Sequence, residues 1–194
     1  MGLDLGWATP VEWVERIAPY ELELLSDHAH CELKAAAMGQ VLIAKNPEYP
    51  TLVEAITPIV IEEMQHFGLV FEELTRRGGQ LGEQMPSPYA DGLHRGSAEG
   101  RTSMLLDRLL IAHLIEGRSL ERLHLLSSFH PDVKLRAMFG GLCASEAQHR
   151  AVFLGLAADF FGVAANSRLD ELTRLEATVL EGLSFAPRVH SGMC

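Results

Sequence analysis

Four long segments of the chain each carry an apolar stripe at helical spacing, and one glutamate interrupts each stripe near its middle. Residues three or four apart share one face of a helix, so each stripe predicts a helix with a buried face. A carboxylate on such a face is costly to bury unless a cation compensates its charge. The first two glutamates are 31 residues apart and the last two are 30 apart. They are Glu32, Glu63, Glu116 and Glu146.

In two of these segments a histidine follows the glutamate after three residues. The sequence reads IEEMQHFG around Glu63 and His66, and ASEAQHRA around Glu146 and His149. This spacing places both side chains of a pair on one helical face. The chain therefore contains two similar helix pairs, each with a lone Glu and a Glu-x-x-His.

Carboxylate and imidazole ligands suit iron or manganese, and a pair of divalent ions would compensate four inward carboxylates. Ferritin-like di-iron and di-manganese bundles use this same set of ligands. A single Glu-x-x-His is a weak signal, but here the helix, the stripe and the partner glutamate agree. A third pair, Glu121/His124, lies about 140° around the helix from Glu116. We therefore expect it at the surface.

Turn and capping signals predict an all-α four-helix bundle, and the match of its glutamates and histidines to the ferritin-like template makes a ferritin-like bundle the expected fold. Thr9 and Pro10 mark the start of a short helix that ends near Pro19. Pro58 lies inside one of the long helices, where it bends the helix or marks a later start. The long helices are predicted at about 20–45, 51–77, 101–129 and 132–161.

A long crossover at 78–100, rich in Gly, Pro and Ser, separates the second long helix from the third and holds a short helix around 89–94. Ser167 has capping-box spacing and predicts an extra C-terminal helix at about 167–183. We expect one ferritin-like domain over 1–194, with the core bundle at about 20–162.

Charge and composition exclude several classes of protein. The net charge is −10, and residues 1–75 hold 3 Lys/Arg and 13 Asp/Glu, whereas 76–194 hold 13 of each. A strongly basic nucleic-acid binder is therefore not indicated, although a local Arg patch remains open. Three cysteines without a CxxC pair favour a reducing cytosol over a disulfide scaffold. We expect no signal peptide and no membrane span.

Several other side chains are candidates for supporting roles. His28, His113 and Glu62 lie close in sequence to the four glutamates, where they could orient a carboxylate. Four arginines flank the crossover and could contact phosphates. They are Arg76, Arg77, Arg95 and Arg101. An alternative is a bundle without metal, in which inward acids pair with basic residues such as Arg118, Arg122 and Arg150.

Five stretches together resemble the tRNA 2-methylthio-N6-isopentenyladenosine hydroxylase family, often called MiaE. They are LLSDHAHCELKAAA, EEMQHFGLVFEELTRRG, SPYADGL, LIEGRSLERLHLL and SEAQHRAVFLGLA. The resemblance covers roughly residues 10–162. DHAHCELKAA and LIEGRSLERL are its more discriminating parts, because the metal motifs are common to ferritin-like di-iron proteins.

The resemblance implies a cytoplasmic non-haem di-iron monooxygenase that uses O₂ and two reducing equivalents. Its cofactor would be two iron ions rather than manganese, with Glu63 and Glu146 as bridging carboxylates. Its substrate would be the isopentenyl group on the modified adenosine of the tRNA anticodon loop. The electron donor is not identified, and we expect a monomer or dimer. The implied iron ligands are Glu32, Glu63, His66, Glu116, Glu146 and His149.

Two other functions remain open at this point. A ferritin- or rubrerythrin-like protein would oxidise Fe(II) or detoxify peroxide, although the lack of a CxxC module disfavours a complete rubrerythrin. A non-enzymatic bundle would bind RNA or protein through its surface and would need no metal.

Overall fold

The computed structural model describes residues 5–97 and 100–193, apart from the side chains of residues 101 and 102. Within this part of the chain the regular secondary structure is helical, and it contains no β-strand. A short 3₁₀ helix, Ala18–Tyr20, links the first two α-helices. The α-helices are α1 (Glu12–Ile17), α2 (Glu21–Lys45), α3 (Pro50–Arg76), α4 (Pro88–His94), α5 (Arg101–Phe129), α6 (Val133–Phe161) and α7 (Val163–Glu181).

The chain divides into two compact units. The first, the α2–α3 unit, comprises these two helices, the segment that follows them to Met85, and residues 187–189. The second, the α5–α6 unit, contains α1, α4, α5, α6 and α7. A single domain over 1–194 stays a prediction.

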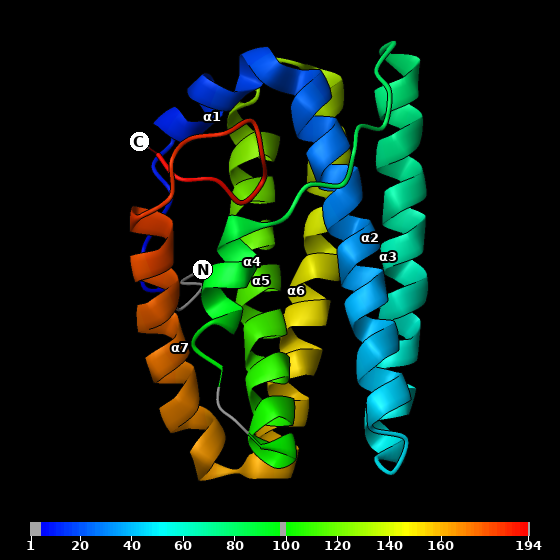
Figure 1. Ribbon diagram of the computed structural model, residues 1–194. Coiled ribbons are helices and arrows are strands. Elements are labelled where there is room, and N and C mark those ends of the chain that lie inside the picture. The colour runs from blue at the N-terminus through cyan, green and yellow to red at the C-terminus, as the bar shows by residue number, and fades with distance from the viewer. Residues whose placement is uncertain (1–4, 98–99, 194) are drawn as a thin grey trace. The chain divides into compact units, whose positions relative to one another are not determined.

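In the α2–α3 unit the two helices run antiparallel and side by side (Figure 1). Asn46 ends α2, and its side-chain amide donates to the Leu42 carbonyl at 2.8 Å. Pro50 then begins α3, where the missing N–H of proline costs no helical hydrogen bond. The helix continues through Pro58 to Arg76, so Pro58 does not mark a later start.

A glycine brings α2 and α3 close together. A Cβ atom on Gly39 would lie 2.6 Å from Val60 Cγ2 and 3.3 Å from Ile56 Cγ2. These distances are shorter than ordinary carbon–carbon contacts, so a larger residue fits only if the Val60 side chain or α3 itself moves. The close approach brings inward side chains of the two helices within ligand distance of each other.

In the α5–α6 unit, α5 and α6 also form an antiparallel pair (Figure 1). Asp132 caps α6, because its carboxylate accepts from the backbone N–H groups of Lys134 at 2.7 Å and Leu135 at 3.2 Å. Helix α7 packs against α4, α5 and α6. Both helix pairs have short connections, which are residues 46–49 between α2 and α3 and residues 130–132 between α5 and α6.

A buried polar network stabilises the α5–α6 unit. Arg118 and Glu176 are both fully buried and form a two-pronged ion pair, with Nε to Oε1 at 2.8 Å and Nη2 to Oε2 at 3.0 Å. Tyr89 of α4 donates its hydroxyl to the same Oε1 at 2.9 Å. Arg118 also pairs with Glu121. The network therefore joins α4, α5 and α7 through the Glu176 carboxylate.

A second buried arginine, Arg122, lies beside this network. Its guanidinium stacks 4.3 Å over the Trp13 ring and donates to the Ser191 carbonyl at 2.9 Å. Burial, and then the neighbouring charge of Arg118, lower the pKa of Arg122 to about 10. The aromatic face and the backbone carbonyl offset part of this cost.

Three local predictions differ from the structure. Thr9 does not cap α1, since its hydroxyl donates to Glu121 Oε2 at 2.6 Å. Glu121 is therefore mostly buried, at 14% exposure, rather than a surface residue. Helix α7 begins at Val163 instead of Ser167, because Gly162 adopts φ 55° and allows an abrupt reversal directly after α6.

Candidate metal centre

The α2–α3 unit brings three potential ligands together. One atom each from Glu32, Glu63 and His66 lie within 4.8 Å of one another, and we call these residues the first triad. His66 Nδ1 is 3.8 Å from Glu32 Oε2 and 3.9 Å from Glu63 Oε2. Both glutamates are almost fully buried, at 4% and 1% exposure. Two carboxylates held this close away from water require a compensating positive charge.

His28 supports the first triad from one turn earlier on α2. Its Nε2 lies 2.6 Å from Glu32 Oε1, within hydrogen-bond distance. Burial alone would raise the pKa of Glu32, but the charge and hydrogen bond of His28, with the hydrogen bond of His66, lower it below its ordinary value. Glu32 is therefore held in the ionised form that a metal ligand needs.

The α5–α6 unit contains a matching set. One atom each from Glu116, Glu146 and His149 lie within 4.8 Å of one another, and we call these residues the second triad. All three are buried. Glu146 and His149 interrupt a stripe on α6 that is otherwise apolar, and Phe139 and Phe153 are fully buried on that stripe before and after them. The sequence therefore places a charged cluster within a hydrophobic face in this unit too.

His113 precedes Glu116 by one turn on α5. Its Nδ1 donates to the Arg150 carbonyl oxygen at 2.9 Å, which fixes the tautomer of the ring. Gly117 allows α6 to come close, since a Cβ there would lie 3.0 Å from Arg150 Nε. His113 thus ties α5 to α6 one turn away from the second triad.

The donor chemistry fits divalent iron or manganese. Each triad offers two carboxylates and one imidazole, which are ligands for these ions and unlike the thiolates of many zinc sites. Ferritin-like bundles hold two such ions with one Glu and one Glu-x-x-His from each helix pair. Each unit supplies that set.

The sequence left open a bundle without metal, in which arginines would pair with the inward glutamates. The two buried arginines of α5 have other partners. The acidic partners of Arg118 are Glu176 and Glu121. Arg122 binds Thr9, Ser191 and the Trp13 ring. These charges serve the buried network of the α5–α6 unit.

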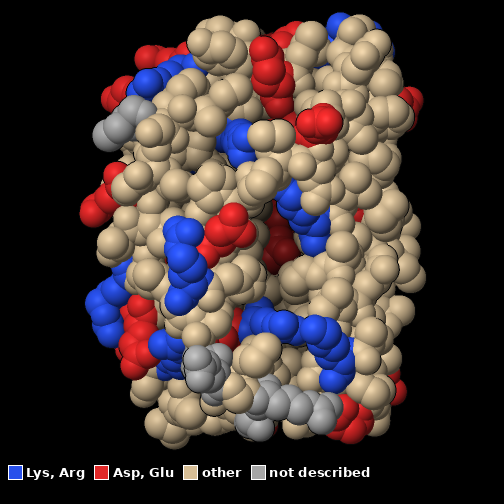
Figure 2. Space-filling view, in the orientation of Figure 1, with Lys and Arg blue, Asp and Glu red and all other residues tan. Residues whose placement is uncertain are grey.

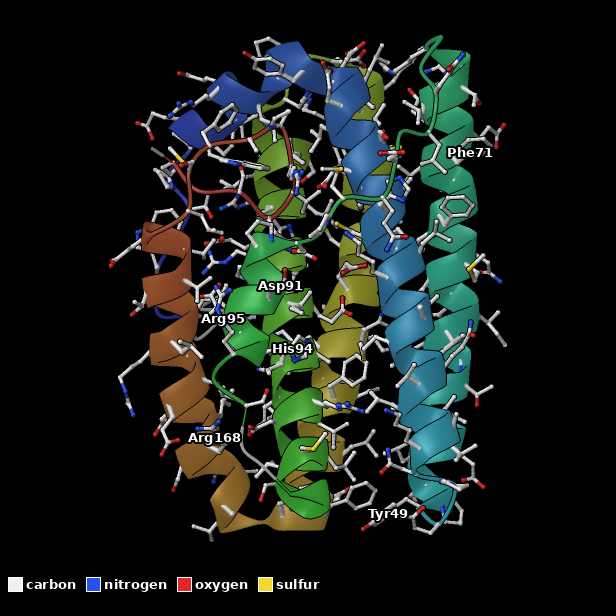
Figure 3. The ribbon with its side chains drawn as sticks, viewed as in Figure 1. Tyr49, Phe71, Asp91, His94, Arg95 and Arg168 are labelled. Atoms are coloured by element: carbon white, nitrogen blue, oxygen red, sulfur yellow. The ribbon has the colours of Figure 1, made fainter. Side chains whose placement is uncertain are left out.

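The four arginines predicted to contact phosphates differ in their surroundings. Arg76 pairs with Glu73 at 2.5 Å, and Arg77 pairs with Glu73 at 2.6 Å and with Glu21 at 3.0 Å. Arg95 is exposed at the end of α4 (Figure 3). The side chain of Arg101 lies outside the described residues. Glu62, beside the first triad, is half-buried.

A separate cavity was not anticipated from the sequence. It has a volume of about 390 Å³ and is lined by His94, Ser97, Met104 and Arg108 of the α5–α6 unit. His94 and Ser97 belong to the Gly- and Pro-rich crossover, where residue spacing predicts no common face. The only sequence signal was the concentration of basic residues around the crossover.

The fold and the two triads define a class of protein, the ferritin-like carboxylate–metal proteins. The family model described as "tRNA-(MS[2]IO[6]A)-hydroxylase (MiaE)" matches residues 4–191. The chain therefore belongs to this family.

Two relatives carry the name tRNA 2-(methylsulfanyl)-N(6)-isopentenyladenosine(37) hydroxylase. The protein from Pseudomonas putida is 34% identical over 190 residues, which cover 97% of this chain and 92% of the relative. The protein from Salmonella typhimurium is 27% identical over 164 residues, covering 84% and 59% respectively.

A solved structure shares the fold. It is titled "Protein 43 with aldehyde deformylating oxygenase activity from Synechococcus" and is 35% identical, with a TM-score of 0.92. The match covers 97% of this chain and 96% of that chain. It confirms the all-α, ferritin-like fold class predicted from the sequence.

Proposed function

We propose that this protein is a non-haem di-iron monooxygenase of the tRNA hydroxylase family. Its substrate would be the isopentenyl side chain of 2-methylthio-N6-isopentenyladenosine in tRNA. The observation that carries this proposal is the presence of one Glu, Glu, His triad in each unit, with all four glutamates buried. The family match along the chain supplies the reaction. It favours hydroxylation over ferritin-like iron oxidation, peroxide detoxification or binding without chemistry.

In this proposal the two triads would supply the ligands of two iron ions. Each triad carries two negative charges, and the two sets together balance two divalent ions. When bound, the iron pair would activate O₂ with two reducing equivalents, so that one oxygen atom enters a C–H bond and the other leaves as water. The identity of the metal as iron rests on the family.

The residues of the chain would position the ligands and exclude water. His28 holds Glu32 ionised and oriented, and we propose that His113 fixes the α5–α6 contact beside Glu116. Phe139 and Phe153, which are fully buried on the same stripe of α6, would help to keep water from the second triad. A dry, apolar setting suits an isopentenyl group and keeps solvent from competing for the oxidant.

The partner would be the tRNA anticodon loop, whose single-stranded bases can be presented without opening a duplex. None of the described helices is long and apolar enough to cross a membrane. We propose a cytoplasmic location, with a separate electron donor and a monomeric or dimeric state.

The likeness to the Synechococcus structure raises a second candidate function. That structure is 35% identical, a value similar to that of the Pseudomonas relative, and its title gives an aldehyde deformylating oxygenase activity. The two names differ in their substrates, an aldehyde in one case and a modified adenosine of tRNA in the other. The substrate must therefore be tested directly.

The test uses reduced, iron-loaded protein mixed with tRNA that carries the isopentenyl modification, followed by O₂. Digested nucleosides are analysed by mass spectrometry, and we expect the modified adenosine to gain one oxygen atom. A parallel reaction with a long-chain aldehyde is analysed for loss of the formyl group. Aldehyde turnover without tRNA oxidation would reject the hydroxylase assignment.

Two matched variants test the ligand assignment. Glu63→Ala should lower the bound iron per chain and abolish hydroxylation, since it removes a buried carboxylate of the first triad. Glu72→Ala removes an exposed carboxylate from the same helix and should leave both quantities unchanged. Equal iron content in the two variants would remove Glu63 from the ligand set.

A further inference from the structure

The cavity of about 390 Å³ in the α5–α6 unit has a basic wall. Arg108 of α5 and His94 of α4 line it together with Ser97 and Met104. Arg108 is half-buried and makes no hydrogen bond or ion pair with any residue that the structure describes. A half-buried guanidinium without a counter-charge is costly, so this position favours an anionic ligand.

The electrostatics of His94 point the same way. Burial, and then the charge of Arg108, lower the pKa of His94, against the opposing effect of Asp91. Arg108 is therefore close enough to His94 to repel its protonated form. Arg95 adds a further exposed positive charge at the end of the same helix (Figure 3). None of the described residues that line the cavity is acidic, so its wall carries a net positive charge from Arg108.

The wall of the cavity is held in place by a second, separate arginine. Arg168 of α7 donates to Asp107 at 2.8 and 2.9 Å and to the Gly96 carbonyl at 2.6 Å. The almost fully buried Asp107 holds Arg168 in place. The hydrogen bond from Arg168 to the Gly96 carbonyl then fixes the backbone next to Ser97. The charge of Arg168 is already matched by Asp107 and Glu171. Arg168 thus positions the wall and leaves Arg108 to meet the ligand.

Close packing adds to this rigidity. A Cβ on Gly96 would lie 2.4 Å from Leu175 Cδ2, and a Cβ on Gly92 would lie 2.7 Å from Val179 Cγ1. Helix α4 and the turn after it therefore lie directly on α7. Figure 2 shows basic and acidic side chains close together on the surface over α4 and α7.

Ser97 supplies a neutral donor. Its hydroxyl oxygen is buried and has no hydrogen-bond partner among the described residues. A phosphate has oxygens for both a guanidinium and a hydroxyl, whereas a lone chloride or carboxylate offers fewer acceptors. A volume of about 390 Å³ also exceeds that of a bare phosphate, which suits a phosphate attached to a sugar.

We infer that this cavity binds a backbone phosphate of the RNA substrate, with Arg108 as its main charged contact and Ser97 as its hydrogen-bond donor. This inference rests on the proposed function for its choice of RNA. It assigns the phosphate contact to Arg108. Neither the net charge of the chain nor its motifs indicated this residue. Phosphate contacts position the nucleic acid without reading its sequence.

The test measures binding of a fluorescent anticodon stem-loop RNA without the isopentenyl group, at several salt concentrations. Arg108→Gln should weaken binding about 10-fold and reduce the slope of log K against log salt by about 0.7 to 0.9. Arg108→Lys keeps the charge and should keep most of that slope. Arg174→Gln is the control, because it removes one exposed charge from α7 outside the cavity.

Equal RNA affinity and salt slope for Arg108→Gln and Arg174→Gln would overturn the inference. Weaker binding of inorganic phosphate by Arg108→Gln, with RNA binding unchanged, would also overturn it, because the cavity would then be a small-anion site. Thermal melts by circular dichroism confirm that each variant is folded. Since the RNA lacks the group to be oxidised, these results do not depend on whether hydroxylation occurs.

Discussion

Replacing Arg118 with methionine tests how much the α5–α6 unit depends on its buried ion pair. Arg118 and Glu176 are both fully buried, and two hydrogen bonds of 2.8 and 3.0 Å join them. In Arg118→Met, Glu176 keeps only the hydrogen bond from Tyr89 among the described residues. An uncompensated buried carboxylate of this kind costs about 3–5 kcal/mol.

The loss should be visible in ordinary unfolding experiments. For a chain of this size each kcal/mol corresponds to about 2–4 °C, so the melting temperature should fall by roughly 6–20 °C. Urea unfolding followed by circular dichroism gives the free energy of unfolding directly. All variants are compared in the same metal state, since a bound ion would stabilise the folded chain.

A double-mutant cycle separates the ion pair from lost packing. Glu176→Leu and the double variant Arg118→Met/Glu176→Leu complete the cycle. The double variant should recover about 2 kcal/mol relative to the sum of the two single losses. Losses that simply add, or an Arg118→Met loss below about 1 kcal/mol, would refute the reasoning.

Three further predictions follow from local contacts. Gly39→Ala should destabilise the chain by about 1–3 kcal/mol because its Cβ meets Val60, whereas Gly68→Ala has open space and should stabilise it by up to about 1 kcal/mol in urea unfolding. Hydrogen bonds from the two arginines that follow Glu73 lower the pKa of its carboxyl, so its stabilisation is present above its ordinary pKa and lost as the pH falls. The difference in melting temperature between wild type and Glu73→Gln should therefore shrink from neutral pH to acid pH. Burial raises the pKa of the Cys31 and Cys143 thiols, so iodoacetamide at neutral pH should modify them only in urea, as peptide mass spectrometry would show.

Helix positions were predictable where the signal was local. The end of α5 and the start of α6 follow from the HPD turn, and Asp132 caps α6 through its own carboxylate. The inward positions of the triad glutamates and histidines were also predictable, because helical spacing places each of them on the apolar face of its own helix. Their closeness within each unit then follows from pairing of consecutive helices.

Long-range partners were not predictable. Thr9 has the spacing of a helix cap, yet its hydroxyl binds Glu121, which lies 112 residues away. Glu121 was expected at the surface because its helical angle points away from Glu116. That angle does not show that Thr9 and Arg118 cover the side chain. Arg118 and Glu176 carry no sequence signal of their pairing. Local pattern cannot report contacts made across the fold.

The spacing of each triad bears on how the chain is made. The two glutamates of each triad come from two consecutive helices and lie 31 or 30 residues apart, so a single helical hairpin brings them together. Local hairpins close early, because little loop entropy is lost. During synthesis the α2–α3 hairpin can leave the ribosome before α6 is translated. On the proposed assignment, a nascent chain can capture its first ion while incomplete, and iron starvation would lower the yield of folded protein as well as its activity.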